Sequence, residues 1–435
     1  MRNYAILLYY DPRVKYSVNA LTAVLDKSRY WDVYLVRDLS KIIELAHKLS
    51  KIYNKVVIGI SFNTLMLTEE RFLKTLILLN KSKPYNVVSV AGGPHPTGDP
   101  VGCIEKLEFD YVVVGEGERS FIELLEALFL GMNDPYKVKG VFTKYEDRYV
   151  FPGRQEPIDL DEYHPFPFWR NLCGAIEITR GCPYGCFYCQ VSYMHGFRPR
   201  HRSIESIVYY AELMAKHGFK DIRFITPNGL GYGLKRKQRE PNIEIIEELL
   251  SRLYDRVVKV HGGRIFYGTF PSEVRPEHLT KEAIKVLKKY VANKNIIIGA
   301  QSGSNRILKA IGRGHTIEDV FNAVEIALKN NFIPDVDFIL GLPGETREDI
   351  EETISSMKKL VNIGARIHLH VFMPLPGTPY SAKKPGAVPE WVRKEILKFI
   401  GKGAAYGQWM KQEIMARKIY ELRKKGIISY GSNNN

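Results

Sequence analysis

The sequence lacks the features of membrane and secreted proteins. None of its apolar runs reaches the roughly 20 residues that a membrane-spanning helix needs. Residues 1–10 are apolar, but they have neither the basic start nor the small-residue cleavage site of a signal peptide. The 435 residues include only five cysteines, which in such a chain do not indicate a disulfide framework. We therefore expect a cytoplasmic protein with no contact to a membrane.

The composition is that of a folded protein with a basic charge balance. Hydrophobic residues make up 45% and charged residues 26% of the chain, and the length predicts two or three domains. Lys and Arg number 63 against 48 Asp and Glu, which gives a net charge of +15. The basic residues are dispersed, with modest clusters at residues 235–239 and 423–425. This pattern favours solvated faces, and nucleic acid or a polyanionic substrate stays open as an alternative partner.

Strand-like and helix-like segments alternate over residues 1–135. Strands are expected at residues 4–10, 33–36, 55–62, 86–91 and 110–114, with helices at residues 19–27, 40–51, 68–81 and 120–130. This alternation predicts an α/β fold with a doubly wound, Rossmann-like parallel sheet. Ligands of such sheets bind beyond the carboxyl ends of the strands, where residues 92–96 and 115–118 form glycine-containing loops.

A second α/β unit follows a hairpin and a linker rich in proline and aromatic residues at residues 136–170. Over residues 171–386 we expect strands at residues 175–179, 221–226, 264–269, 295–300, 334–341 and 366–372, with helices between them. Six such units are too few for a complete eight-unit barrel, so the pattern predicts an open, partial (β/α)6 barrel. Residues 387–435 are expected to form a helical extension.

Three of the five cysteines fall within eight residues, at Cys182, Cys186 and Cys189. They follow the first strand of the predicted barrel, at the end that carries the chemistry in strand–helix barrels. Three thiolates in a glycine-rich loop can bind a soft metal or an iron–sulfur cluster. A structural zinc with His195 as fourth ligand is the alternative. A cubane cluster held by only three cysteines would leave one iron open to bind and activate a substrate. The other two cysteines, Cys103 and Cys173, have the pattern of small buried residues.

The Cys-x-x-x-Cys-x-x-Cys spacing, with Tyr188 before the last cysteine, resembles the radical S-adenosylmethionine (SAM) superfamily. The resemblance implies that the three cysteines hold a 4Fe-4S cluster whose fourth iron chelates the amino and carboxylate groups of SAM, with Tyr188 beside the cofactors. One electron, from a donor such as a ferredoxin or flavodoxin, then splits SAM into methionine and a 5′-deoxyadenosyl radical.

The resemblance extends along the predicted barrel. Residues 298–304 resemble the fourth-strand motif of the family, which implies contacts of Gln301 and Ser302 with the ribose. Residues 337–346 resemble the fifth-strand motif, which implies that Ile339 and Gly341 pack against the adenine. Residues 226–229 lack the acidic side chains that many relatives carry after the second strand, so the group that holds the methionine amino group is not identified.

The two glycine-containing loops of the first domain resemble the cobalamin-binding-domain branch of the superfamily. Glycines let the backbone approach a flat, bulky ligand closely. The domain has no Asp-x-His-x-x-Gly motif, so no protein histidine is expected on cobalt, and His95 could equally hydrogen-bond within its own loop. The residues that the resemblance implies around a cobalamin are Gly92, Gly93, His95, Gly115, Glu116 and Gly117.

The function predicted from these resemblances is cobalamin-dependent methyl transfer to an unactivated carbon or phosphorus of an unidentified substrate. The same radical could instead start a cyclisation, a rearrangement or an oxidation without methyl transfer. A nucleic-acid-binding or modifying protein is the alternative from a different class, and it predicts steeply salt-dependent binding.

Overall fold

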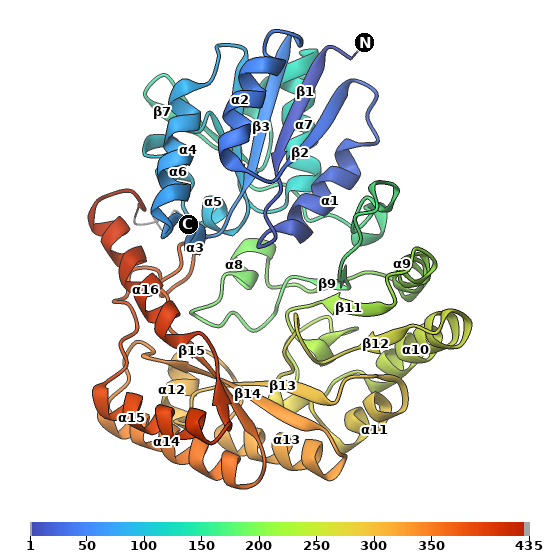
Figure 1. The fold of residues 1–435 in the computed structure, drawn as a ribbon, viewed down its shortest axis with the longest axis vertical. Helices are drawn as coiled ribbons and strands as arrows, with labels where there is room; N and C mark the ends of the chain where they lie inside the picture. The colour runs from blue at the N-terminus through green and yellow to red at the C-terminus, as the bar shows by residue number, and fades with distance from the viewer. Residues whose placement is uncertain (1, 430–435) are drawn as a thin grey trace.

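A seven-stranded sheet forms the centre of the N-terminal unit in the computed structural model, which describes residues 2–429 (Figure 1). Its first five strands in spatial order are parallel, and the last two are antiparallel. From edge to edge they are β2 (Trp31–Val36), β1 (Tyr4–Tyr9), β3 (Lys55–Ser61), β4 (Val87–Gly92), β5 (Tyr111–Val113), β6 (Val141–Tyr145) and β7 (Arg148–Val150). The doubly wound parallel sheet expected from the sequence is confirmed.

The direction of strand addition reverses at β1, because β2 lies on one side of it and β3 on the other. Right-handed crossovers then place the helix before the reversal, α1, and the helices after it, α2 and α4, on opposite faces of the sheet. Accordingly α1 packs with α7, and α2 packs with α4. Such a reversal opens a crevice at the carboxyl ends of the strands. The helices are α1 (Lys15–Leu25), α2 (Leu39–Leu49), α3 (Thr64–Leu67), α4 (Glu70–Ser82), α5 (Pro94–Gly98), α6 (Pro100–Glu105) and α7 (Gly117–Leu130).

The hairpin of β6 and β7 belongs to this sheet. Val113 of β5 pairs with Val141 of β6, so the first sheet continues beyond the boundary at residue 135 that the sequence pattern indicated. The alternation of side chains shows a hairpin, but it does not show which edge the hairpin joins, because strand pairing is a tertiary contact.

The second unit is a partial barrel of six parallel strands in two groups of three. An isolated bridge from Val274 to Ile298 joins the groups, and a short antiparallel pair, β9 (Thr179–Arg180) and β10 (Arg200–His201), lies at the base of the cysteine loop. The barrel strands are β8 (Ile176–Glu177), β11 (Asp221–Ile225), β12 (Arg264–Phe266), β13 (Asn295–Gln301), β14 (Ile333–Leu340) and β15 (Arg366–Val371). They lie at the six positions that the sequence predicted.

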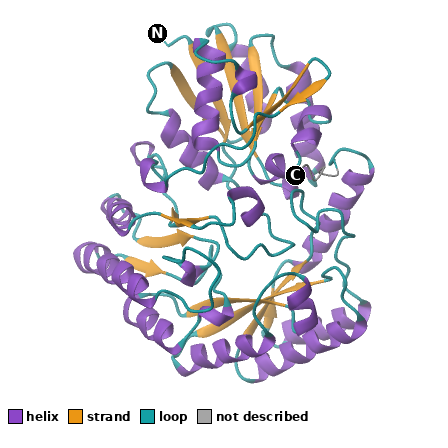
Figure 2. Ribbon diagram, turned by 180° about the vertical axis from the view of Figure 1, so that it is seen from behind, coloured by secondary structure: helices purple, strands orange, loops and turns teal. Residues whose placement is uncertain are grey.

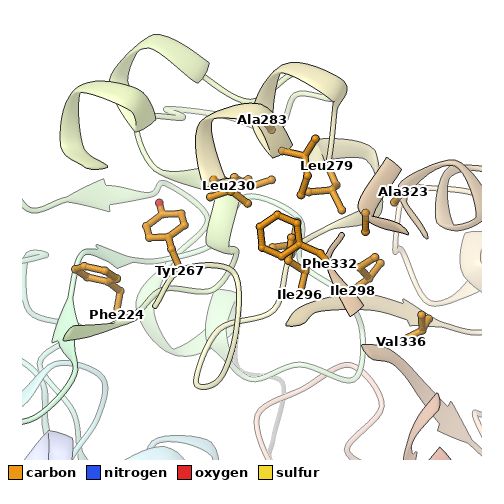
Figure 3. Packing of buried hydrophobic residues seen from close by; sticks show 14 of the residues in the cluster. Phe224, Leu230, Tyr267, Leu279, Ala283, Ile296, Ile298, Ala323, Phe332 and Val336 are labelled. Atoms are coloured by element: carbon orange, nitrogen blue, oxygen red, sulfur yellow. The ribbon is translucent and has the colours of Figure 1, made fainter. Parts of the chain in front are cut away.

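Helices cover the outer side of these strands (Figures 1 and 2). Between the two layers lies a continuous apolar core, in which Tyr267, Ile298 and Phe332 are almost completely buried (Figure 3). This packing holds the strands rigidly, so that the loops at their carboxyl ends have fixed positions. The helices of this layer are α9 (Ile204–Lys216), α10 (Ile243–Leu253), α11 (Lys281–Tyr290), α13 (Ile317–Lys329) and α14 (Arg347–Asn362), whereas α12 (Asn305–Ala310) packs in a separate apolar cluster with Leu342 and Phe372.

The C-terminal segment connects the two units. After α15 (Glu390–Gly401), a short strand β16 (Ala405–Tyr406) extends the barrel sheet beside β15, which the expected all-helical extension did not include. Then α16 (Trp409–Lys424) runs back to the N-terminal unit (Figure 1), where Ile419 and Ile428 join its core. Residues 430–435 of the predicted extension lie outside the described residues. Within residues 2–429, no helix is long and apolar enough to cross a membrane.

Candidate active site

The three clustered cysteines lie on one loop, residues 181–199, between β9 and β10. Gly181 has a positive φ of 85°, and a Cβ there would lie 2.7 Å from the carbonyl oxygen of Arg198. The loop is further closed by the backbone N–H of Cys182, which donates to Gly196, and that of Cys189, which donates to Cys186. All three cysteines are free, and they line a single cavity of about 290 Å³, here called the barrel cavity. The local fold thus gathers three thiols on one wall.

Burial makes two of these thiols, Cys182 and Cys189, poor nucleophiles on their own. It raises the pKa of Cys182 above its usual value and that of Cys189 to about 12. Such thiols are deprotonated when a metal binds them, because metal ligation needs the thiolate. The Arg313 guanidinium supplies a positive charge, with Nη1 3.8 Å from the Cys186 Sγ. Three thiols around one cavity, with a cation beside them, fit an iron–sulfur cluster.

The structural-zinc alternative requires His195 as the fourth ligand beside the three cysteines. His195 lines a different cavity, and its Nδ1 lies 3.8 Å from a carboxylate oxygen of Glu116. His195 is therefore not placed to complete a Cys3His site.

Gln301 enters the barrel cavity from a strained position at the end of β13. Its φ is +72°, and the register between β13 and β14 shifts between Gly299 and Gln301. Left-handed backbone in a residue other than glycine is costly and is often found at functional sites. Its Nε2 donates to Glu273 at 3.1 Å, and Arg313 Nη2 donates to the other oxygen of Glu273 at 3.0 Å. These hydrogen bonds connect Gln301, at the end of the fourth barrel strand, to the Arg313 guanidinium beside Cys186.

The other residues expected around SAM fall into two groups. Tyr188 and Ile339 line the barrel cavity, as the resemblance implied. Ser302 does not, because its buried hydroxyl lies 3.3 Å from Thr353 Oγ1 and accepts from the backbone of Ser304. Gly341 also lies outside the lining, where its φ of +70° lets the chain at residues 386–387 pass closely. These two residues shape the strand-end loops.

Several residues of the barrel cavity were not found from the sequence. Glu273 follows the third barrel strand and brings a carboxylate into the cavity, whereas the loop after the second strand has none. Its place just after a strand is the signal by which the sequence could have marked it. Gln412 comes from α16, far along the chain, and no local signal marks it. The cysteines, Tyr188 and Gln301 apart, the polar and charged residues of the lining are Tyr184, Ser192, Asn228, Glu273, Arg275, Arg313, Asp337, His370 and Gln412.

A second cavity of about 330 Å³, here called the domain cavity, lies at the carboxyl ends of the N-terminal strands and reaches the barrel strands β8 and β11. Its lining includes Gly92, Gly93, Gly115, Glu116 and Gly117, all expected from the sequence. A Cβ on Gly92 would meet no atom within 4 Å. Because protein packing does not require a glycine there, its lack of a side chain leaves room for a ligand.

The domain cavity also contains an unsatisfied polar atom. The buried Ser61 Oγ, at the end of β3, has no hydrogen-bond partner among residues 2–429. Buried hydroxyls are normally hydrogen-bonded, so this atom fits a ligand with polar groups. The open glycine wall and the free hydroxyl at a strand-order reversal fit a corrinoid.

His95 does not line the domain cavity, contrary to the expectation. The chain turns into α5 at Pro94, and the fully buried His95 ring stacks on Phe62 with 5.4 Å between centroids. Its Nδ1 lies 3.0 Å from Thr64 Oγ1. The partner of His95 is thus a residue of α3, and not of its own loop as the alternative had it.

Buried ion pairs join the two units beside the domain cavity. Arg180, two residues before Cys182, contacts Glu118 and Glu177 at 2.7 Å and Glu116 at 3.4 Å. Burial alone would raise the pKa of Glu116, but His195 and the neighbouring arginines hold it well below its usual range. Glu116 is therefore a carboxylate that ties the N-terminal unit to the cysteine loop.

The short helix α8 (Val191–His195) lies between the N-terminal unit and the barrel strands (Figure 1), and its residues line both cavities. Val191 and Ser192 line the barrel cavity, whereas Met194 and His195 line the domain cavity. Just before the helix, Gln190 Nε2 donates to the carbonyl oxygens of Pro94 and Pro376. A ligand in each cavity would thus face the other across one turn of chain.

Comparison with known proteins finds one family model for each of the two units. The Radical SAM superfamily model matches residues 176–357, and the B12 binding domain model matches residues 15–125. An uncharacterized protein of Methanocaldococcus jannaschii is 28% identical over 369 residues, covering 74% of this chain and 70% of the relative. An uncharacterized methyltransferase of Pyrococcus horikoshii is 28% identical over 327 residues, covering 72% and 66%. The chain thus spans about two thirds of each relative.

The fold is also that of a solved structure. The radical S-adenosylmethionine methyltransferase TsrM from Kitasatospora setae, solved with cobalamin and a [4Fe-4S] cluster bound, superposes with a TM-score of 0.69. The match covers 88% of this chain and 78% of TsrM, at 18% sequence identity. The likeness therefore establishes the fold of the two units together.

Proposed function

Because the chain belongs to the radical SAM superfamily, in the branch that carries a B12-binding domain, we propose that it is a cobalamin-dependent radical SAM methyltransferase. Its acceptor would be an unactivated carbon or phosphorus. The observation that carries the proposal is the pair of cavities on either side of α8, one with three free thiols and one with an open glycine wall. Methyl transfer needs the methyl carrier and the radical source to reach one substrate.

Each cavity has residues suited to one cofactor. Cys182, Cys186 and Cys189 would hold the 4Fe-4S cluster, and Gln301 and Ile339 would contact SAM. Gly92, Gly115 and Ser61 would lie against cobalamin. When bound, these groups would supply a 5′-deoxyadenosyl radical from SAM and a transferable methyl group.

The protein itself would supply charge, orientation and exclusion of water. Arg313 balances negative charge beside Cys186, and Glu273 positions both Arg313 and Gln301. Glu273 is also a carboxylate that could accept from the methionine amino group. The ion pairs of Arg180 hold the cysteine loop against the N-terminal unit and would thereby keep the two cofactor sites in register. A one-electron donor such as a ferredoxin or flavodoxin would be required.

The test is an optical spectrum of the protein purified anaerobically from cells supplied with iron, sulfide and cobalamin. We expect broad cluster absorption together with corrinoid bands that survive desalting. With reductant and SAM, the protein should form 5′-deoxyadenosine, and Cys186→Ala should not.

The other outcomes are equally informative. Cluster absorption without corrinoid would overturn methyl transfer in favour of a radical cyclisation, rearrangement or oxidation. A folded protein that holds zinc and neither chromophore would overturn the radical assignment. Steeply salt-dependent binding of RNA by the loaded enzyme would point to a nucleic-acid substrate.

A further inference from the structure

Two phenylalanine side chains are exposed on the cysteine loop. Phe187 directly follows Cys186 and is 38% exposed, and Phe197, near the end of the loop, is 54% exposed. Cys186 and Tyr188, the chain neighbours of Phe187, line the barrel cavity, whereas Phe187 and Phe197 line neither cavity. The loop therefore presents its thiols to the cavity and these two phenyl rings to its outer side.

Three segments of the chain meet at Phe187. Its backbone N–H donates to the carbonyl oxygen of Ile311, after α12, at 3.0 Å, and its own carbonyl oxygen accepts from the N–H of Tyr380 at 3.1 Å. The rings of Phe187 and Tyr380 pack edge to face, with 5.7 Å between centroids. Phe197 packs on the same loop, because a Cβ on Gly185 would lie 2.7 Å from its ring. The two exposed rings thus belong to one packed surface.

The charge of this surface has one sign. The cysteine loop and the two segments packed on Phe187, residues 305–316 and 373–389, contain six Lys and Arg and no Asp or Glu. Two of the six, Arg306 and Arg313, pair with carboxylates of other segments. The other four are exposed and form no ion pair within residues 2–429, namely Arg198, Lys309, Lys383 and Lys384.

Contacts of Tyr380 place two of these cations beside the phenyl rings. Its hydroxyl donates to the carbonyl oxygen of Ala310 at 3.2 Å, and Lys309 is the residue before Ala310. Lys383 Nζ lies 6.0 Å from the centroid of the Tyr380 ring. Because Tyr380 packs on Phe187, both lysines border the exposed ring.

A second basic segment, residues 235–237, borders the cysteine loop. Its sequence is Lys-Arg-Lys, and its side chains are exposed and unpaired within the described part of the chain. Tyr184 of the cysteine loop donates to the carbonyl oxygen of Gln238 at 2.9 Å, and Lys237 Nζ lies 5.8 Å from the centroid of the Tyr184 ring. Positive charge therefore continues along the cysteine loop.

Exposed aromatic rings with unpaired cations around them are suited to an acidic protein partner. Buried aromatic anchors supply much of the binding energy of protein interfaces. Charges of one sign around them attract a partner of the opposite sign and speed its association. The proposed function requires such a partner, because a one-electron donor must come close to the cysteines.

Nucleic acid is the competing partner, because it also binds to basic and aromatic side chains. A nucleic-acid substrate would have to place its reacting group inside a cavity, and the two exposed rings line neither cavity. A protein that only delivers an electron does not need to enter. Only the cysteine loop would separate it from the thiols, so the position of the surface favours an electron donor.

We propose that Phe187, Phe197 and the unpaired cations around them form the docking surface for a small acidic electron-transfer protein, a flavodoxin or a ferredoxin. The proposal rests on the proposed function, because it takes the three cysteines as ligands of a 4Fe-4S cluster. The step that it serves is the transfer of one electron through the cysteine loop. With flavodoxin as the carrier, FMNH⁻ is oxidised to FMNH•, the oxidised cluster gains the electron, and no bond or proton moves.

Charge reversal tests this surface. The double variant Lys309→Glu/Lys383→Glu changes two exposed lysines that line neither cavity. With dithionite, a small reductant that needs no docking, it should keep the native cluster absorption and the native yield of 5′-deoxyadenosine. Reduced flavodoxin should reduce its cluster at least about tenfold more slowly than that of the native enzyme. Stopped-flow absorbance measures this rate.

The double variant Lys285→Glu/Lys288→Glu is the matched control. It makes the same change of net charge at two exposed lysines of α11, in the helix layer outside the barrel strands (Figure 1). Its rate of reduction by flavodoxin should stay within about twofold of the native rate. Added salt should slow this reduction steeply in the native enzyme and in the control, and only slightly in Lys309→Glu/Lys383→Glu.

The apolar part of the surface is tested by binding alone. Oxidised flavodoxin is titrated onto the immobilised, cluster-loaded enzyme at low salt. Phe197→Ser should weaken this binding at least about fivefold, because it removes an aromatic anchor. Tyr209→Ser, at another exposed ring on the outer helix α9, is the control and should bind like the native enzyme. Equal affinities of the two variants would contradict the role of the phenyl ring.

Three further outcomes would overturn the proposal. The first is an equal rate of reduction by flavodoxin in the two double variants. The second is a native cluster that dithionite reduces but neither flavodoxin nor ferredoxin reduces. The third is loss of single-stranded RNA binding in Lys309→Glu/Lys383→Glu with a native rate of reduction by flavodoxin, which would assign the surface to nucleic acid. A native chain that assembles no cluster would contradict the proposed function as well, whereas these three outcomes contradict the docking surface alone.

Discussion

The domain cavity and the barrel cavity differ in the groups that line them, although they lie on either side of one short helix. Glycines, aliphatic side chains and backbone form much of the domain cavity, whose charged groups are largely paired with one another across the interface. In the barrel cavity, charged and polar side chains from five barrel strand ends and from α16 stand among apolar residues such as Ile339 and Phe372. The first arrangement is suited to a large preformed ligand, and the second to reacting groups.

This difference has a consequence for mutation. A cavity defined by missing side chains is destroyed by adding one, whereas a cavity defined by functional groups is destroyed by removing one. If the two sites are independent, each change should remove one cofactor and leave the other in place.

The largest expected effect is at the cysteine loop. Cys186→Ala should remove the iron–sulfur absorption and all SAM cleavage, because a cubane needs each of its three thiolate ligands. Corrinoid retention after desalting should not change. Iron content, 5′-deoxyadenosine yield and corrinoid bands are the measurements. Cys173→Ala, at a cysteine outside both cavities, is the matched control and should retain the cluster. Retention of iron by Cys186→Ala would contradict the site.

The reciprocal change fills the domain cavity. Gly92→Leu should weaken corrinoid binding at least about tenfold, or about 1.4 kcal/mol, because its side chain would occupy the ligand space. Cluster content should stay at the native level. Gly401→Leu is a matched control, since a Cβ at this exposed helix end also meets no atom within 4 Å. Equal corrinoid affinity in both variants would refute the domain cavity as the corrinoid site.

The ion pairs between the units test whether the two sites are held together. Arg180→Met leaves three carboxylates around a buried position, and breaking a buried pair typically costs about 3–5 kcal/mol of unfolding free energy. Arg264→Met breaks an exposed pair with Asp221 and should cost about 0–1 kcal/mol. Urea unfolding of the two variants compares them. Similar losses would mean that the buried network contributes no more than a surface pair.

A smaller, pH-dependent effect is expected at Asp337. Burial raises its pKa from 3.8 to about 6, although the hydrogen bond from His368 opposes the rise. The folded chain thus binds this proton more tightly than the unfolded chain, and the stability it contributes below pH 4 is lost as the pH rises through 6. Asp337→Asn should therefore be more stable relative to the native chain at pH 8 than at pH 4, by up to about 3 kcal/mol.

Unfolding at the two pH values measures this effect. Asp221→Asn, which removes an exposed carboxyl in the same way, is the control. A pH-independent difference for Asp337→Asn would mean that the carboxyl is not buried in the native protein. It would also weaken the contrast between the domain cavity, which missing side chains define, and the barrel cavity, which functional groups define.

Local sequence patterns predicted the strands well, because buried parallel strands are continuous apolar runs bounded by turns. They also predicted the wall of the domain cavity, since glycines at strand ends have a local signature. His95 and Ser302 show the limit of this reasoning. Each belongs to a motif whose neighbours line a cavity, but the direction of its own side chain depends on the turn that follows.

The sequence by itself determined the two α/β units, the cysteine loop and the glycine wall, because each depends on residues close together in the chain. Only the tertiary structure decided that Arg313 and Glu273 meet beside Cys186, that Arg180 ties the cysteine loop to the N-terminal unit, and that Gln412 orients His370. These contacts join residues 40 or more positions apart. Their partners are selected by the packing of whole elements, and no short pattern records that packing.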